Sequence, residues 1–199
     1  MFEDSDFNIF NVDSLESRMQ LIKTVIDLKF ELAAKAILPI LNASGQTWYA
    51  HVAKHLRRTT NAPDNTWVAF SPNKRGYKMM PHFELGIWSD HVYIYLAVEE
   101  NMKPKHTVEA VEKLLTAQTA VSELPSDFVI SLDHMVNVSH QLSVTAYGEA
   151  ITRFSEIKHS EILIGMKLSR GDSRFESGKD LLAITEVIEN LLPIYEIIK

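Results

Sequence analysis

The segment from residue 79 to residue 98 constrains the fold most, because its apolar and polar residues alternate on both sides of a short turn. Alternation with a period of two is typical of strands that bury one face. Ser89-Asp90 is short enough for a two-residue hairpin loop between strands 79–88 and 91–98. Pairing Trp88 with His91 then places six apolar residues on one face, in the pairs Ile87–Val92, Leu85–Ile94 and Phe83–Leu96. A shift of one residue would destroy this sorting, so the sequence predicts an antiparallel hairpin in this register.

Helical periodicity appears on both sides of the hairpin. Asp13 and Glu16 form the pattern of a capping box, and the apolar spacing that follows predicts a helix ending near Ala36, before Pro39 interrupts it. Similar spacing predicts helices over 46–58, 107–122, 147–157 and 179–197, the last one kinked at Pro193.

Short apolar runs predict additional strands over 66–70, 128–132 and 161–168, with a further short strand within 135–142. The chain contains no internal repeat and no linker-like segment. The sequence therefore predicts one α+β domain over residues 1–199, with an N-terminal arm over 1–12 and helices packed around a mainly antiparallel sheet.

Composition excludes several classes of site. The chain has 199 residues and no cysteine, so disulfides, thiolate zinc sites and cysteine nucleophiles are excluded. The acidic N-terminus lacks the pattern of a secretory signal, and no apolar run approaches the roughly 20 residues of a membrane helix. We therefore expect a cytoplasmic protein without a membrane partner.

Charge is distributed unevenly along the chain. Residues 48–88 contain six lysine and arginine residues but two acidic residues, a net charge of +4. The rest of the chain has 14 basic and 24 acidic residues, a net charge of −10. The same basic segment holds all three tryptophans. A local basic patch on an acidic protein can attract an anion such as a phosphate. An ordinary solvated surface is the alternative interpretation.

We expect the anion ligand to contact basic and aromatic side chains of this segment and the hairpin. Arginine offers a fork of donors, lysine a point charge and histidine a donor with adjustable charge. The predicted ligand-binding residues are Lys54, His55, Arg57, Arg58, Lys74, Arg75, Lys78, Tyr93 and Tyr95.

Histidines in the same segment are candidates for catalysis. On the predicted 46–58 helix, His51 and His55 would share one face, as paired histidines do in helical zinc sites. Lys54 and Arg58 would repel a dication there, so we expect neither a metal nor a cofactor.

The second face of the hairpin carries His82, Glu84, Tyr93 and Tyr95. A histidine and a carboxylate can perform acid–base chemistry, and the tyrosines could stack on a ring. Alternatively, the 46–58 helix simply covers this face. The candidate catalytic residues are His51, His55, His82 and Glu84.

A weaker constellation lies further along the chain. Asp133, His134 and nearby serines are the residue types of a hydrolase triad, but no nucleophile-elbow motif accompanies them.

Three functions remain open from these residues. The first is a binding module for a phosphorylated small molecule or a nucleic-acid backbone. The second is a small enzyme that acts on a phosphate-bearing substrate in a histidine-lined cleft. The third is a module that binds an acidic protein.

Several longer motifs resemble a known family. They are SLESRM at 14–19, HVAKHLRRT at 51–59, TWVAF at 66–70, KRGYKMMPHFELGIW at 74–88, RFSEIKHSEILIG at 153–165 and LLPIY at 191–195. These motifs extend over most of the chain and resemble the YktB-like family of uncharacterised bacterial proteins. The resemblance implies a compact α+β domain and no particular activity, substrate or cofactor.

Overall fold

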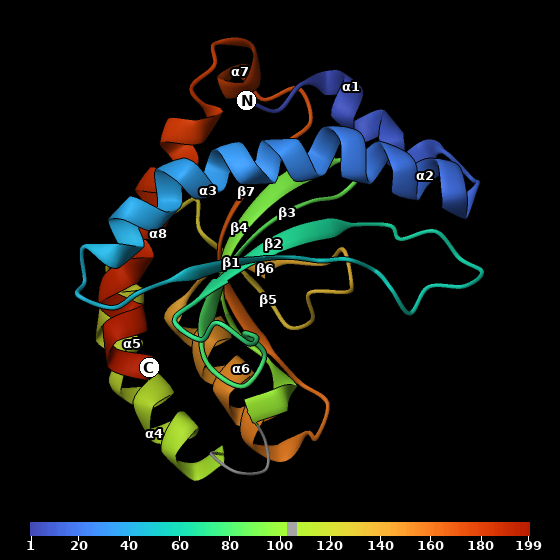
Figure 1. Cartoon of the computed structure of the whole chain (residues 1–199). Helices are drawn as coiled ribbons and strands as arrows, with labels where there is room; N and C mark the ends of the chain where they lie inside the picture. The colour runs from blue at the N-terminus through green and yellow to red at the C-terminus, as the bar shows by residue number, and fades with distance from the viewer. Residues whose placement is uncertain (103–106) are drawn as a thin grey trace.

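The fold is built on a seven-stranded antiparallel sheet, seen in a computed structural model that describes residues 1–102 and 107–199 (Figure 1). Its strands are β1 (Tyr49–Val52), β2 (Thr66–Ser71), β3 (His82–Ile87), β4 (His91–Val98), β5 (Val129–Ser131), β6 (His140–Gln141) and β7 (Ile162–Ser169). Their order in the sheet is β1-β2-β3-β4-β7-β5-β6, and each neighbouring pair is antiparallel.

The predicted hairpin is confirmed as β3 and β4. Ile87 pairs with Val92, Leu85 with Ile94 and Phe83 with Leu96. The strands predicted over 66–70, 128–132 and 161–168 correspond to β2, β5 and β7.

Helices cover one face of the sheet. They are α1 (Asp4–Phe7), α2 (Leu15–Leu21), α3 (Asp27–Asn42), α4 (Thr107–Thr116), α5 (Gln118–Ser122), α6 (Val144–Glu156), α7 (Ser173–Glu176) and α8 (Asp180–Ile198), with shorter helical turns η1 (Asn8–Asn11), η2 (Ile22–Ile26) and η3 (Glu100–Met102). In Figure 1, α3 crosses the sheet above, α8 runs along its left side, and α4 and α6 lie below. One continuous hydrophobic core joins these helices to the first face of the sheet.

The helices predicted over 107–122, 147–157 and 179–197 are confirmed as α4 with α5, α6 and α8. The α+β class, with helices packed around an antiparallel sheet, is also confirmed. None of the helices among the described residues is both long and apolar enough to span a membrane.

The first long helix differs from the prediction at both ends. Its N-cap is Ser14, whose side chain accepts a hydrogen bond from the Ser17 backbone, and not Asp13. Helical structure continues through η2 and α3 to Asn42, so Pro39 does not end it. Pro39 and Lys35 are both exposed, and water can therefore satisfy the Lys35 carbonyl that the proline leaves without a partner.

The helix predicted over 46–58 is wrong. Residues 49–52 form the edge strand β1 and residues 53–65 form a loop. β2 is buried along its whole length, so its outer backbone groups require partners, which β1 supplies. Tertiary pairing has therefore overridden a helical pattern that is visible in the local sequence.

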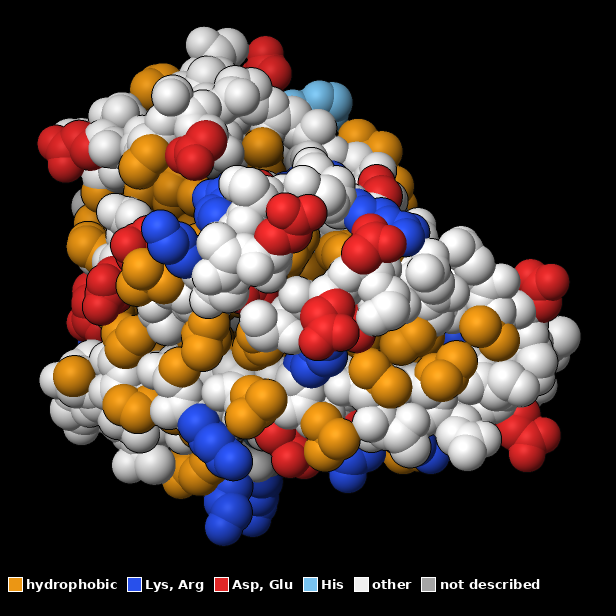
Figure 2. Space-filling view, turned by 90° about the horizontal axis from the view of Figure 1, so that it is seen from above, with side chains coloured by type: hydrophobic (Ala, Val, Ile, Leu, Met, Phe, Trp, Pro, Cys, Tyr) orange, Lys and Arg blue, Asp and Glu red, His pale blue; other side chains and the backbone are white. Residues whose placement is uncertain are grey.

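The first twelve residues fold against the core as α1 and η1. Phe2, Phe7, Ile9 and Phe10 are buried there. On the face seen from above in Figure 2, acidic and basic side chains are interspersed with hydrophobic ones.

Candidate functional site: a buried histidine–glutamate cluster on the second face of the sheet

Alternation along the strands gives the sheet a second face with polar and aromatic side chains. His82 and Glu84 of β3 pair with Ala97 and Tyr95 of β4 and point to this face. No helix among the described residues packs over it. Side chains from two loops cover it instead, with Tyr77 from residues 72–81 and His134 from residues 132–139.

Gly86 makes room for the ring of Tyr93 on this face. A Cβ atom added to Gly86 would lie 2.1 Å from Cζ of Tyr93. The two tyrosines of β4, Tyr93 and Tyr95, stack with their ring centroids 4.8 Å apart. Tyr93 and Tyr95 therefore form a floor of stacked rings, the tyrosine floor, beside His82 and Glu84.

Three ionisable side chains converge next to this floor. His82 Nε2 lies 3.3 Å from Glu84 Oε1 and 3.5 Å from Glu99 Oε1. All three side chains are completely or almost completely buried. His82 Nδ1 lies 2.9 Å from the Met80 carbonyl and donates to it, so Nε2 is the nitrogen that faces the two carboxylates.

Several buried polar atoms at this place have no hydrogen-bond partner among the described residues. They are Glu84 Oε2, Glu99 Oε1 and the hydroxyl of Tyr93. Buried polar atoms are almost always paired, so a group of unpaired ones indicates a function, a water or an ion.

A second buried pair adjoins the first cluster. His134 donates to Glu161 Oε2 twice, from its backbone N–H at 3.0 Å and from Nδ1 at 2.7 Å. Its ring also packs edge-on against Trp67. Burial lowers the pKa of His134, but the hydrogen bond to Glu161 and the charges of Glu84, Glu161 and Glu99 outweigh this effect and raise it to about 9.

The two carboxyl groups of the first cluster differ in acidity. Burial alone raises the pKa of Glu84, but the hydrogen bond with His82 and the nearby positive charges leave it below its ordinary value. Burial and the charge of Glu84 raise the pKa of Glu99. Neighbouring groups whose pKa values are shifted in opposite directions are common at functional sites.

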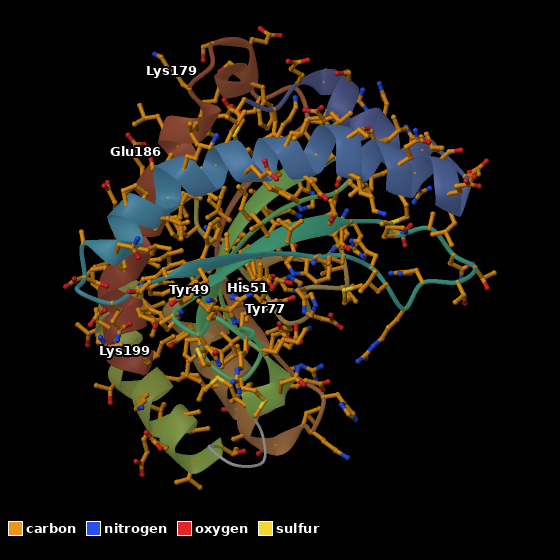
Figure 3. All side chains as sticks on the ribbon, viewed as in Figure 1. Tyr49, His51, Tyr77, Lys179, Glu186 and Lys199 are labelled. Carbon is orange, nitrogen blue, oxygen red and sulfur yellow. The ribbon has the colours of Figure 1, made fainter. Side chains whose placement is uncertain are left out.

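The loop over residues 72–81 connects this cluster to the surface. Lys78 Nζ donates to Glu99 Oε2 at 2.9 Å, and the lysine side chain is 44% exposed while that of Glu99 is 1% exposed. Tyr77 accepts a hydrogen bond from Trp67 Nε1 and packs beside His82. In Figure 3, Tyr77 and His51 lie close together beneath β1, and their ring centroids are 5.8 Å apart.

The predicted site residues are only partly brought together. His82, Glu84, Tyr93, Tyr95 and Lys78 all belong to or adjoin the second face.

His51 and His55 do not share a helical face. His51 is in β1, with Nε2 3.0 Å from the Asn73 carbonyl, so it anchors the 72–81 loop. His55 lies in the loop after β1, with Nε2 3.0 Å from Thr66 Oγ1. Their predicted catalytic role stays a prediction.

The remaining basic residues occupy two loops. Lys54, Arg57 and Arg58 follow β1, whereas Lys74 and Arg75 follow β2. Because β1 and β2 are antiparallel, these loops start from opposite ends of the pair, roughly 10 Å apart along the strands. None of these five side chains has an ion pair within the part of the chain that the structure describes. Their binding of an anion stays a prediction.

Sequence reasoning missed Glu99, Glu161 and His134 as members of one site. Strict alternation could have found Glu99, because it continues the 93, 95, 97 series of β4, and Glu161, because it precedes Leu163 and Gly165 in the same series of β7. His134 lies in a loop and pairs with Glu161, not with Asp133. No local pattern predicts that contact.

Comparison with known proteins identifies the family. Residues 2–195 match the domain of unknown function DUF1054. The chain belongs to this family. A UPF0637 protein from Leuconostoc mesenteroides is 56% identical over 199 residues, and one from Leuconostoc citreum is 55% identical, each covering 100% of both chains. A UPF0637 protein from Lactiplantibacillus plantarum is 44% identical over 98% of this chain and 94% of its own length. The predicted resemblance to an uncharacterised bacterial family is thus confirmed.

Proposed function

We propose that this DUF1054 protein is a small enzyme that acts on a phosphate-bearing ligand at the second face of its sheet. The observation that carries the proposal is the buried cluster of His82, Glu84 and Glu99, with its unpaired oxygen atoms. In this proposal the cluster exchanges protons with the ligand. The two basic loops, residues 53–65 and 72–81, attract the ligand.

The energetic cost of the cluster argues against a purely structural role. Burying a charged group costs several kcal/mol unless it is paired and hydrogen-bonded. Glu84, Glu99 and Glu161 are all buried, and two of them have an oxygen without a partner among the described residues. Apolar residues at these positions would support the sheet at lower cost, so the cluster is better explained by chemistry.

The basic loops suggest the class of ligand. Loop 72–81 folds back beneath β1, since Asn73 contacts His51 and Tyr77 contacts Trp67. Lys74 and Arg75 in this loop, and Arg57 in the loop after β1, are exposed. Exposed cations raise the local concentration of anions and increase their association rate. A phosphate group fits such cations.

The test combines binding and turnover. We would titrate pyrophosphate, a nucleotide and a short single-stranded RNA into the protein at low and high salt, and measure phosphate release from phosphate monoesters and anhydrides. Arg57→Glu with Arg58→Glu should weaken binding at least about tenfold, because a hydrogen bond to a charged group contributes about 1.5–3 kcal/mol. Glu84→Gln should lower turnover about 100-fold or more while the ligand still binds.

Lys179→Glu is the matched control. Lys179 is exposed at the N-terminal end of α8, far from both loops in Figure 3, and its substitution reverses one positive charge, as each of the two arginine substitutions does. It should change neither binding nor turnover. The proposal is wrong if no phosphate compound binds at low salt. It is also wrong if the affinity changes neither with salt nor with the paired arginine substitution.

A binding module without catalysis is the second candidate. It is favoured by the exposure of the cationic side chains outside the buried cluster. Salt-sensitive binding that Arg57→Glu with Arg58→Glu removes, without turnover of any compound and without an effect of Glu84→Gln, would support it. Preference for RNA over the small phosphates would indicate a nucleic-acid ligand.

A further inference from the structure

We propose that His82, Glu84 and Glu99 bind one divalent transition-metal ion. One candidate ligand atom from each of these residues lies within 4.8 Å of the other two. His51 and His55, whose spacing resembles that of a helical zinc site, lie on separate elements with other partners. The set proposed here depends on Glu99, which joins His82 and Glu84 through the β3–β4 pairing.

The separations between these atoms suit a single ion. Two ligands bound at about 2.1 Å in tetrahedral geometry lie about 3.4 Å apart. His82 Nε2 is 3.3 Å from Glu84 Oε1 and 3.5 Å from Glu99 Oε1. Small side-chain movements would therefore bring all three groups onto one ion.

The atoms around the candidate ligands are already arranged to orient them. His82 Nδ1 donates to the Met80 carbonyl, so Nε2 is the nitrogen that would bind a metal, with loss of the proton that Glu84 Oε1 accepts from it. Lys78 and Asn101 both donate to Glu99 Oε2, at 2.9 Å and 3.0 Å. Its other oxygen, Oε1, has no hydrogen-bond partner among the described residues. Such outer contacts are typical of metal sites, where they fix the tautomer and orientation of each ligand.

A cation would also satisfy the remaining groups. Glu84 Oε2 is buried and unpaired within the described chain, as is the Tyr93 hydroxyl. Bidentate binding of the Glu84 carboxylate to an ion at this place would use both of its oxygens, and a water bound to the ion could pair with the phenol. This second observation separates the cluster from an ordinary group of acidic side chains.

The donor set indicates the kind of metal. One imidazole nitrogen and two carboxylates favour Zn²⁺, Mn²⁺ or Fe²⁺ over Ca²⁺ and Mg²⁺, which typically bind at sites with oxygen ligands alone. The chain has no cysteine, which removes the thiolate ligands that select Cu⁺.

His134 and Glu161 form the adjoining layer of the site. Glu99, His134 and Glu161 also have ligand atoms within 4.8 Å of one another. Glu161 Oε2 already accepts two hydrogen bonds from His134, so these ligand atoms are used in contacts between the two residues. We therefore assign one ion to the His82 cluster and a supporting role to the His134–Glu161 pair.

The experiment uses the full chain, stripped with a chelator and then titrated with Zn²⁺, Mn²⁺ and Co²⁺. We expect one ion per chain, a higher melting temperature with metal, and a Co²⁺ absorption spectrum that reports a nitrogen–oxygen ligand set. Glu84→Gln, Glu99→Gln and His82→Gln should each lower metal affinity at least about tenfold.

The glutamine variants also test folding. Glu99→Gln keeps the size of the side chain and removes a buried charge whose Oε1 has no hydrogen-bond partner among the described residues. The metal-free Glu99→Gln variant should therefore be as stable as the metal-free parent or more stable, and it should lose the stabilisation by metal. His140→Gln is the matched control, because it makes the same substitution as His82→Gln at an exposed histidine of β6 outside the cluster; it should retain the metal. Stoichiometric binding that survives Glu84→Gln combined with Glu99→Gln would overturn the inference, as would the absence of binding by all three ions.

The inference shares its cluster with the proposed enzyme, but metal binding does not depend on turnover. A protein that binds one ion through these residues without acting on any phosphate compound would retain the metal site and reject the proposed function. A protein that turns over a phosphate compound but binds none of the three ions would do the reverse.

Discussion

His55 illustrates at the scale of single residues how the surroundings change a side chain. Its ring packs edge-on against Trp67, with centroids 5.6 Å apart, and its backbone has a φ of 48°. Burial and then the charge of Arg58 lower the pKa of His55 to about 4. From sequence alone, this histidine is expected to carry part of a basic patch; in the folded chain it is neutral near pH 7.

The shifted pKa makes stability depend on pH. The unfolded chain has a His55 pKa near 6.5, so between about pH 4 and pH 6.5 it binds a proton that the native state does not. The contribution of His55 to stability is therefore complete above about pH 6.5 and is lost as the pH falls towards 4. We expect the urea midpoint to fall across this range, and to fall less in His55→Asn.

Asparagine is suitable for this comparison because it tolerates a positive φ and does not titrate. A proton NMR titration of the His55 ring, assigned by its loss in the asparagine variant, checks the pKa directly. A titration midpoint near 6.5 would contradict the prediction.

The site residues differ in how visible they are in the sequence. His82 and Glu84 are predictable because strand alternation places both on the second face. Their partners Glu99 and Glu161 follow the same alternation beyond the strand ends and are within reach of a stricter analysis. His134 is not, because a loop delivers it and its partner Glu161 is 27 residues away.

Pairing between elements explains the main error at the scale of secondary structure. Residues 46–58 have helical periodicity, but β1 forms because the buried strand β2 needs a partner for its outer backbone groups. The β3–β4 hairpin shows the opposite case. Its short loop and its alternation both predict the same antiparallel register, so local sequence and tertiary structure agree.

The close contact between β3 and β4 at Gly86 gives a prediction at this scale. Gly86→Ala would place a Cβ 2.1 Å from the buried Tyr93 ring, which must then move within a packed floor. We expect a loss of about 1–3 kcal/mol in the free energy of unfolding, measured by urea denaturation.

Gly76→Ala serves as the comparison, because no heavy atom lies within 4 Å of its added Cβ. It should change the free energy of unfolding by less than about 0.5 kcal/mol. Equal effects of the two substitutions would mean that the Tyr93 ring adapts freely.

The sheet determines how stability is distributed over the whole molecule. β4 lies in the interior of the sheet between β3 and β7, whereas β1 is an edge strand of four residues. Edge strands open more readily than central ones, because fewer buried contacts hold them. We expect hydrogen exchange to be slowest in β4 and β7 and clearly faster in β1. Equal protection of β1 and β4 would contradict this assignment.

The sequence by itself determined the α+β class, the hairpin and its register, because these depend on alternation and spacing between near neighbours. It also determined that His82, Glu84, Tyr93 and Tyr95 share one face. Only the tertiary structure decided that β1 is a strand, that loops and not a helix cover the second face, and that His134 joins the cluster through Glu161. Those features depend on contacts between residues far apart in the chain, and local periodicity contains no information about such contacts.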